Sequence, residues 1–169
     1  MASPGVGLSN TPQATANLIE QKLRAERVVK AGASWFLMVG ALSLVNSVLS
    51  MSGAGIRFIF GLGIAEFVDA FAKQAGQVGV VPNLIINACF AGVFVLFWNF
   101  AKKGEQWAFI VGMVLYAADA LAVLAFKDIL AVAFHAYAFF RIYRGMSGIQ
   151  ALKQYETQLQ PAGAPIQPR

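Results

Sequence analysis

Residues 107–143 read WAFIVGMVLYAADALAVLAFKDILAVAFHAYAFFRIY, in which two apolar runs are separated by the charged pair Lys127-Asp128. An α-helix rises about 1.5 Å per residue, so about 20 residues cross a hydrocarbon core of about 30 Å. The first run, 107–126, is long enough, and the second, 129–143, follows after a tight polar turn. This stretch predicts two antiparallel membrane-spanning helices.

Two further apolar runs lie upstream of this hairpin. Residues 83–101 are interrupted only by asparagines and one cysteine, and residues 31–51 contain no charged residue. In the earlier run, Gly40, Ser43 and Ser47 fall roughly on one helical face, where small side chains let a neighbouring helix approach closely. Both runs are near the length of a span, so the sequence predicts four spanning helices in total.

The composition of the whole chain agrees with a membrane location. Of its 169 residues, 58% are hydrophobic and 12% are charged, whereas soluble domains contain about 25% charged residues. The net charge of +5 comes from basic residues that flank apolar runs, the usual orientation signal of membrane proteins. We therefore expect a lipid bilayer as partner, with other membrane proteins or a second copy as further candidates, and no nucleic acid.

Segment 56–72 leaves the number of spans open, because it is short and carries Arg57, Glu66 and Asp69. If it crosses, there are five spans and the basic residues divide evenly between the two sides. If it is interfacial or re-entrant, there are four spans, and most basic residues share one side. These are Lys22, Arg24, Arg27, Lys30, Lys102, Lys103, Arg141, Arg144 and Lys153. The positive-inside rule favours four spans with both termini cytoplasmic, as in a multi-pass protein of the cell (inner) membrane.

The flanks of the predicted bundle are polar. Residues 1–17 lack the apolar core of a cleavable signal peptide, and the C-terminal stretch is rich in proline. The expected organisation is a disordered tail (1–15), a juxtamembrane amphipathic helix (16–30), the membrane helix bundle (31–145), a cytoplasmic helical extension (146–160) and a second disordered tail (161–169). A solvated basic lead-in is an equally good interpretation of 16–30.

Asp119 and His135 form a candidate intramembrane polar pair. An ionised side chain at the centre of a span costs about 2.5–3.5 kcal/mol on insertion scales. Each of the two residues lies eight positions from Lys127, so antiparallel helices place them at similar depth. Tyr116 and Gly112 lie on the same face as Asp119. The pair indicates either a proton relay or polar pocket, or an interhelical hydrogen bond worth about 0.6 kcal/mol.

Glu66 and Asp69 form a candidate polar face at helical spacing. The sequence contains no HExxH, GxSxG or Walker motif. Its single cysteine, Cys89, excludes an intrachain disulfide and a thiolate zinc site. No metal, cofactor or catalytic residue is therefore expected, and we do not expect an enzyme.

Three segments resemble a known group of proteins. They are LSLVNS at 42–47, FGLGI at 60–64 with Asp69, and WAFIVGMVLY at 107–116 with Asp119. They are similar to an uncharacterised family of small bacterial multi-pass integral membrane proteins, over about residues 31–145. The resemblance implies a bacterial membrane location and carries no activity.

The sequence therefore favours a non-enzymatic role as a membrane scaffold or accessory subunit. The small-residue faces and the small mass outside the bilayer motivate this hypothesis. The alternative is a small transporter or channel, in which Asp119, His135, Glu66 and Asp69 line a proton or solute path. A third interpretation, an intramembrane enzyme, needs a polar cavity around His135.

Overall fold

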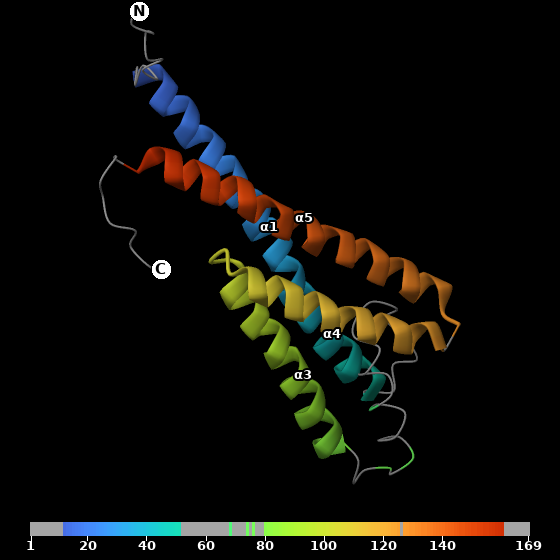
Figure 1. Ribbon diagram of the computed structural model, residues 1–169. Coiled ribbons are helices and arrows are strands. Elements are labelled where there is room, and N and C mark those ends of the chain that lie inside the picture. The colour runs from blue at the N-terminus through green and yellow to red at the C-terminus, as the bar shows by residue number, and fades with distance from the viewer. Residues whose placement is uncertain are drawn as a thin grey trace, which may run out of the picture.

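The computed structural model describes residues 12–51, 80–125 and 127–160, together with Val68, Gln74 and Gly76. This part of the chain is helical and contains no strand, which confirms the predicted all-helical class. Its helices are α1 (Pro12–Met51), α3 (Val80–Ala101), α4 (Gln106–Ala125) and α5 (Ile129–Leu159) (Figure 1).

Three of these helices, α1, α3 and α4, are long and apolar enough to cross a membrane. Helix α5 differs from the fourth span expected over 129–143. Its apolar part ends at Arg141, and the helix continues through polar residues to Leu159. The uncharged stretch of α5 is therefore shorter than the roughly 20 residues that a straight span needs.

Part of the sequence-based prediction falls outside the described residues. Apart from Val68, segment 56–72 belongs to this part with its candidate residues Glu66 and Asp69, and so do residues 1–11 and 161–169. The arrangement of four spans plus one interfacial or re-entrant helix therefore stays a prediction.

Helices α1 and α5 run antiparallel and cross at a pair of glycines. A Cβ atom on Gly145 would lie 2.6 Å from the Cα atom of Gly32, and a Cβ atom on Gly32 would overlap the backbone of Gly145. The same Cβ atom on Gly32 would lie 3.1 Å from the carbonyl oxygen of Arg141. The two backbones therefore touch, as they do at small-residue contacts between membrane helices.

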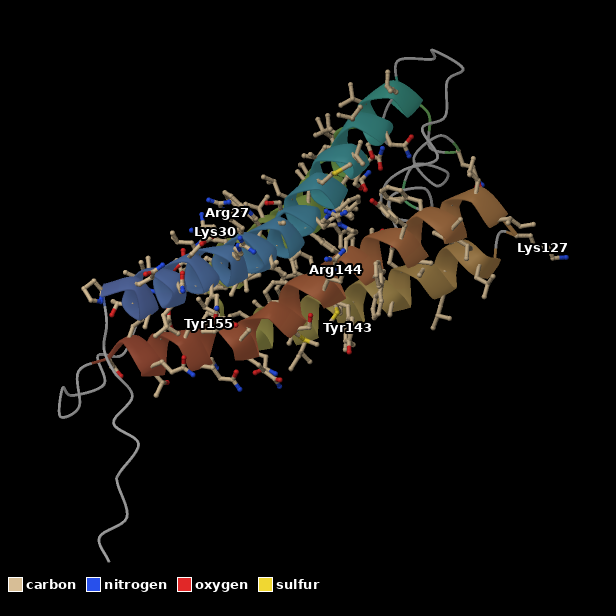
Figure 2. The ribbon with its side chains drawn as sticks, turned by 90° about the horizontal axis from the view of Figure 1, so that it is seen from above. Arg27, Lys30, Lys127, Tyr143, Arg144 and Tyr155 are labelled. Carbon is tan, nitrogen blue, oxygen red and sulfur yellow. The ribbon has the colours of Figure 1, made fainter. Side chains whose placement is uncertain are left out.

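Both helices continue beyond this crossing as a paired extension, which we call the arm (residues 12–30 of α1 and 146–159 of α5; Figures 1 and 2). Its interior is apolar, with Val29 and Ile149 each 1% exposed. Lys22 and Glu156 form an ion pair of 3.8 Å across it. Helix α1 begins at Pro12, earlier than the expected start near residue 16, because proline is well suited to the first helical turn.

The bundle below the crossing has an aromatic core centred on Phe36 of α1. Its ring centroid lies 5.9 Å from those of Phe97 and Phe109 and 6.2 Å from that of Phe94. Gly112 of α4 leaves room for the Phe36 ring, since a Cβ atom there would lie 2.6 Å from it. Phe36 is fully buried, so this cluster joins α1, α3 and α4.

Helices α1 and α3 also run antiparallel. Phe36 packs against Phe97 near the end of α3. Gly40 lies further along α1 and faces an earlier residue of α3, since a Cβ atom on Gly40 would lie 3.3 Å from the carbonyl oxygen of Ala91. The end of α1 and the start of α3 therefore lie at the same end of the bundle (Figure 1).

A tight turn joins α4 to α5. Lys127 adopts a left-handed backbone conformation with φ of 59°, and Asp128 caps the N-terminus of α5. The Asp128 carboxylate accepts hydrogen bonds from the backbone N–H groups of Leu130 at 3.1 Å and Ala131 at 3.0 Å. Such a cap satisfies donors that a helix start otherwise leaves open, and it directs α5 back along α4.

Basic residues from three segments gather near the crossing, at what we call the basic end. Lys30 of α1 and Lys102 and Lys103 of the α3–α4 turn line one cavity. Arg144 of α5 lies near Gly32 on another side. Lys127 lies at the opposite tip, far from Lys30 and Arg144 (Figure 2). The two ends of the described bundle therefore differ strongly in charge.

Candidate functional site

Asp119 of α4 and His135 of α5 meet in the interior of the α4–α5 hairpin. The Nε2 atom of His135 lies 2.9 Å from the Oδ2 atom of Asp119. His135 is 2% exposed and Asp119 is 9% exposed. The Asp128 cap and the short turn set the register of the two helices, because equal distances from Lys127 bring the side chains level.

The second ring nitrogen restricts where the protons of this pair can be. The Nδ1 atom of His135 lies 2.8 Å from the carbonyl oxygen of Ala131. A carbonyl oxygen can only accept, and two acceptors at this distance repel, so Nδ1 carries a hydrogen and donates. A second proton then lies between Nε2 and Oδ2, bound either to the imidazole or to the carboxyl group. In both forms the net charge of the pair is zero, as an imidazolium–carboxylate ion pair or as a neutral imidazole and a carboxylic acid, and this makes burial in an apolar bundle less costly.

Aromatic rings hold the imidazole in place. The ring of Tyr116 stacks on it with a centroid distance of 4.8 Å and an interplanar angle of 16°. Phe134 meets it edge-on, at 6.2 Å and 89°. Sequence spacing places Tyr116 on the face of Asp119, but the stacking on His135 depends on how α4 and α5 pack. The Tyr116 hydroxyl is buried and has no hydrogen-bond partner among the described residues.

An open, apolar groove of about 330 Å³ runs between α3 and α4 beside the pair. Asp119 is the charged residue in its wall. The other lining residues are apolar: Phe90, Val93, Phe94, Leu115, Ala118 and Ala122. The outer rim is exposed on both helices, so the groove is open to the surroundings of the bundle.

The aromatic core separates the pair from the basic end. Along the buried face of α4, the residues between the start of the helix and Asp119 are Ala108, Phe109, Gly112, Met113 and Tyr116. Phe109 packs against Phe36, and Tyr116 packs against Phe94 at 6.2 Å. Within the described residues, no continuous row of polar side chains leads along this face from Asp119 to the basic end.

A second group of buried polar residues lies between α1 and α3. The Asn87 side-chain amide donates a hydrogen bond of 2.9 Å to the Asn83 side-chain oxygen. Ser43 and Ser47 of α1 are also buried, and their hydroxyl groups have no hydrogen-bond partner in the described part of the chain. The antiparallel register set by Gly40 and Ala91 puts these serines roughly level with the two asparagines. The expected use of such residues is to join helices.

The remaining candidates do not join the pair within the described residues. Glu66 and Asp69 lie outside them, so their relation to His135 stays a prediction. In the described ranges, no three His, Cys, Asp or Glu side chains are close enough to hold a metal ion. Cys89 is exposed on α3. Within the described ranges, the geometry brings together the proton-sharing pair of Asp119 and His135.

Comparison of the chain with protein-family models, with curated proteins and with solved structures finds no match. The resemblance to bacterial multi-pass proteins therefore has only the quoted segments behind it, and a bacterial origin is unsupported. The fold by itself shows that the chain contains apolar helices that could span a membrane.

Proposed function

We propose that the chain is a small multi-pass membrane protein that acts as a scaffold or accessory subunit and presents the arm to a partner. The observation that carries this proposal is the continuity of α1 and α5 through the glycine crossing. Helix α1 has 40 residues and is about 60 Å long, about twice the thickness of a hydrocarbon core. The arm is therefore a rigid projection of the bundle rather than a flexible tail.

The proposed topology has four spans, with both termini in the cytoplasm of a bacterial inner membrane. Three segments distant in sequence bring their lysines and arginines to the basic end, and the positive-inside rule assigns such an end to the cytoplasm. Helix α1 ends and α3 begins at the same end of the bundle, so this proposal has segment 56–72 begin and end on one side of the membrane, as an interfacial or re-entrant segment would.

Helix α5 serves as the fourth span in this proposal. His135 lies at the depth of Asp119, in the second half of the apolar helix α4. Arg141 lies over the rings of Trp35 and Tyr137, at 5.6 Å and 6.0 Å. A long basic side chain near a helix end can reach the headgroups and lengthen a short span.

The surface of the arm supports a partner-binding role. Ile19 and Leu23 are each 46% exposed, in a part of α1 that the proposed topology places beyond the hydrocarbon core. A groove of about 250 Å³ lies between α1 and α5 on the other side of α1, and it is lined by Gln21, Arg24, Ala25, Val28, Gly148, Ala151 and Tyr155. Exposed apolar side chains on one face of a helix are typical of helix-docking surfaces. The partner in this proposal is another membrane protein or a second copy of the chain.

Site-specific photo-crosslinking in intact membranes tests the partner. A crosslinker at Ile19 or Leu23 is expected to trap a discrete adduct that co-purifies with the chain. Gln21, which is exposed and which helical spacing puts on the other side of α1, is the matched control and should give no such adduct. A monomer without adducts at all three positions, under conditions that preserve the membrane, would rule the scaffold role out.

Cysteine accessibility tests the topology. After Cys89→Ser, single cysteines at Lys103 and Lys127 are expected to react with a membrane-impermeant maleimide from opposite faces, Lys103 from the cytoplasm. Cysteines at Gly55 and Gln74, which flank 56–72, should both react from the face of Lys127. Reaction of these two flanks from opposite faces would mean that 56–72 crosses and that there are five spans.

A proton or solute path is the second candidate, and the observation that favours it is the buried contact of 2.9 Å between Nε2 of His135 and Oδ2 of Asp119. The pair lies beside the groove between α3 and α4, where a ligand could reach the carboxyl group from the lipid. The aromatic core between the pair and the basic end makes a static channel along the bundle less favourable than the scaffold role. Transport would require Phe36 and its neighbours to move apart.

A further inference from the structure

A cavity of about 370 Å³ lies at the basic end, between the arm and the α3–α4 turn. It joins parts of the chain that are far apart in sequence. Its lining residues are Glu26, Val29, Lys30, Lys102, Lys103 and Leu152. Val29 and Leu152 are buried core residues of the arm, so the cavity has an apolar floor beneath charged walls.

The cavity carries an excess of positive charge. Three of its lining residues are lysines, and Glu26 is its one carboxylate. That carboxylate is already engaged by Lys30 at 3.4 Å and by Lys22 at 3.7 Å. The ammonium group of Lys102 lies 3.8 Å from the centroid of the Trp98 ring, a contact that holds this cation near the wall. The charge therefore favours an anion with strong acceptor oxygens.

The position of the cavity indicates which anion. Trp98 and Trp107 flank the α3–α4 turn, with Phe100 packed against Trp107 at 5.1 Å. Tryptophan gathers at the headgroup level of membrane proteins. A ligand there would have phosphate oxygens near the lysines and apolar parts toward the floor and the bilayer, which is the chemistry of a phospholipid.

We infer that this cavity binds the phosphate group of an anionic phospholipid, with Lys30, Lys102 and Lys103 as its ligands. The inference rests on the membrane location and orientation proposed above. Anionic lipids are attracted to basic residues near the cytoplasmic surface. The cavity gives this attraction a defined place on the protein, because three lysines from α1 and the α3–α4 turn line it.

Lipid binding by the purified full chain tests this site. The chain is placed in nanodiscs of phosphatidylcholine with increasing fractions of phosphatidylglycerol, and the retained lipids are measured by native mass spectrometry. The variant Lys30→Gln, Lys102→Gln, Lys103→Gln is expected to lose selectivity for phosphatidylglycerol by about tenfold or more, since each lysine near a surface contributes substantially to anionic-lipid binding. The double variant Lys30→Gln, Lys103→Gln keeps the Lys102–Trp98 contact and should lose an intermediate amount.

The matched control is Arg24→Gln, Arg27→Gln, Lys153→Gln, which removes the same charge from arm residues outside the cavity. It should change the selectivity by less than about threefold. Equal losses in both triple variants would mean diffuse attraction and overturn the site, as would equal binding of the two lipids by the unaltered chain. Displacement of the lipid by millimolar inorganic phosphate would assign the cavity to a soluble phosphate instead. If the variants stay in the membrane fraction while any of these contradicting results is obtained, the lipid site is disproved and the proposed membrane location still holds.

Discussion

Replacing Gly32 by leucine is expected to prevent the native α1–α5 crossing, and Gly32→Ala should already lower the free energy of unfolding by about 1–3 kcal/mol. The reason is steric. A Cβ atom on Gly32 meets backbone atoms of Gly145, and backbone cannot rotate away as a flexible side chain can. The helices must then separate, which opens the contacts of Val29 and Phe36 on either side of the crossing.

Gly92→Ala is the matched control for this prediction. Gly92 lies within α3, and a Cβ atom there would have no neighbour within 4 Å. Alanine should therefore leave stability unchanged or raise it by up to about 1 kcal/mol, through its higher helix propensity. Thermal unfolding in mild detergent, followed by tryptophan fluorescence, measures both. For a chain of this size, the Gly32→Ala loss corresponds to a decrease in Tm of several degrees, about 2–4 °C per kcal/mol. Equal Tm values for the two variants would contradict the close crossing.

Asp119→Leu and His135→Leu are each expected to lower the free energy of unfolding by about 1–3 kcal/mol, because each removes one side of the buried contact between Nε2 of His135 and Oδ2 of Asp119. The double variant removes both groups and should lose less than the sum. We expect a coupling free energy of about 1 kcal/mol or more. This exceeds the average of about 0.6 kcal/mol for hydrogen bonds in a membrane, since the Ala131 carbonyl and the Tyr116 ring already fix the imidazole. Additive losses would show that the two side chains do not interact.

Asp119→Asn separates the structural role of the pair from a transport role. The asparagine amide can donate to Nε2 while Nδ1 still donates to the Ala131 carbonyl, so the fold should be nearly as stable as the unaltered chain. The variant has lost the ionisable carboxyl group that shares the proton. Proton flux into proteoliposomes that is present in the unaltered chain and lost in a stable Asp119→Asn variant would favour the relay. Flux that survives the substitution would exclude Asp119 from the path.

The helices were predictable because lipid imposes a local rule on sequence. A long apolar run in lipid has to be helical so that its backbone N–H and C=O groups form hydrogen bonds within the run. The helices over 83–101 and 107–126 could therefore be predicted without knowing which helices pack against them. The Asp119–His135 contact was predictable for a related reason. Because the turn is short, residues at equal distances in sequence from Lys127 lie at the same level of the two antiparallel helices. Helix α5 departs from this rule because its packing against α1 and α4, rather than its own apolarity, stabilises it.

What the amino-acid sequence determined by itself is therefore the helical class, the hairpin and the level of its two polar residues, all of which depend on spacing within one segment. The tertiary structure alone decided that Gly32 meets Gly145, that Tyr116 stacks on His135, and that lysines from α1 and the α3–α4 turn share one cavity. These contacts join residues separated by long stretches of chain, and apolar helix faces offer many similar ways to pack. Only the close fit of backbones and rings in three dimensions selects one of them.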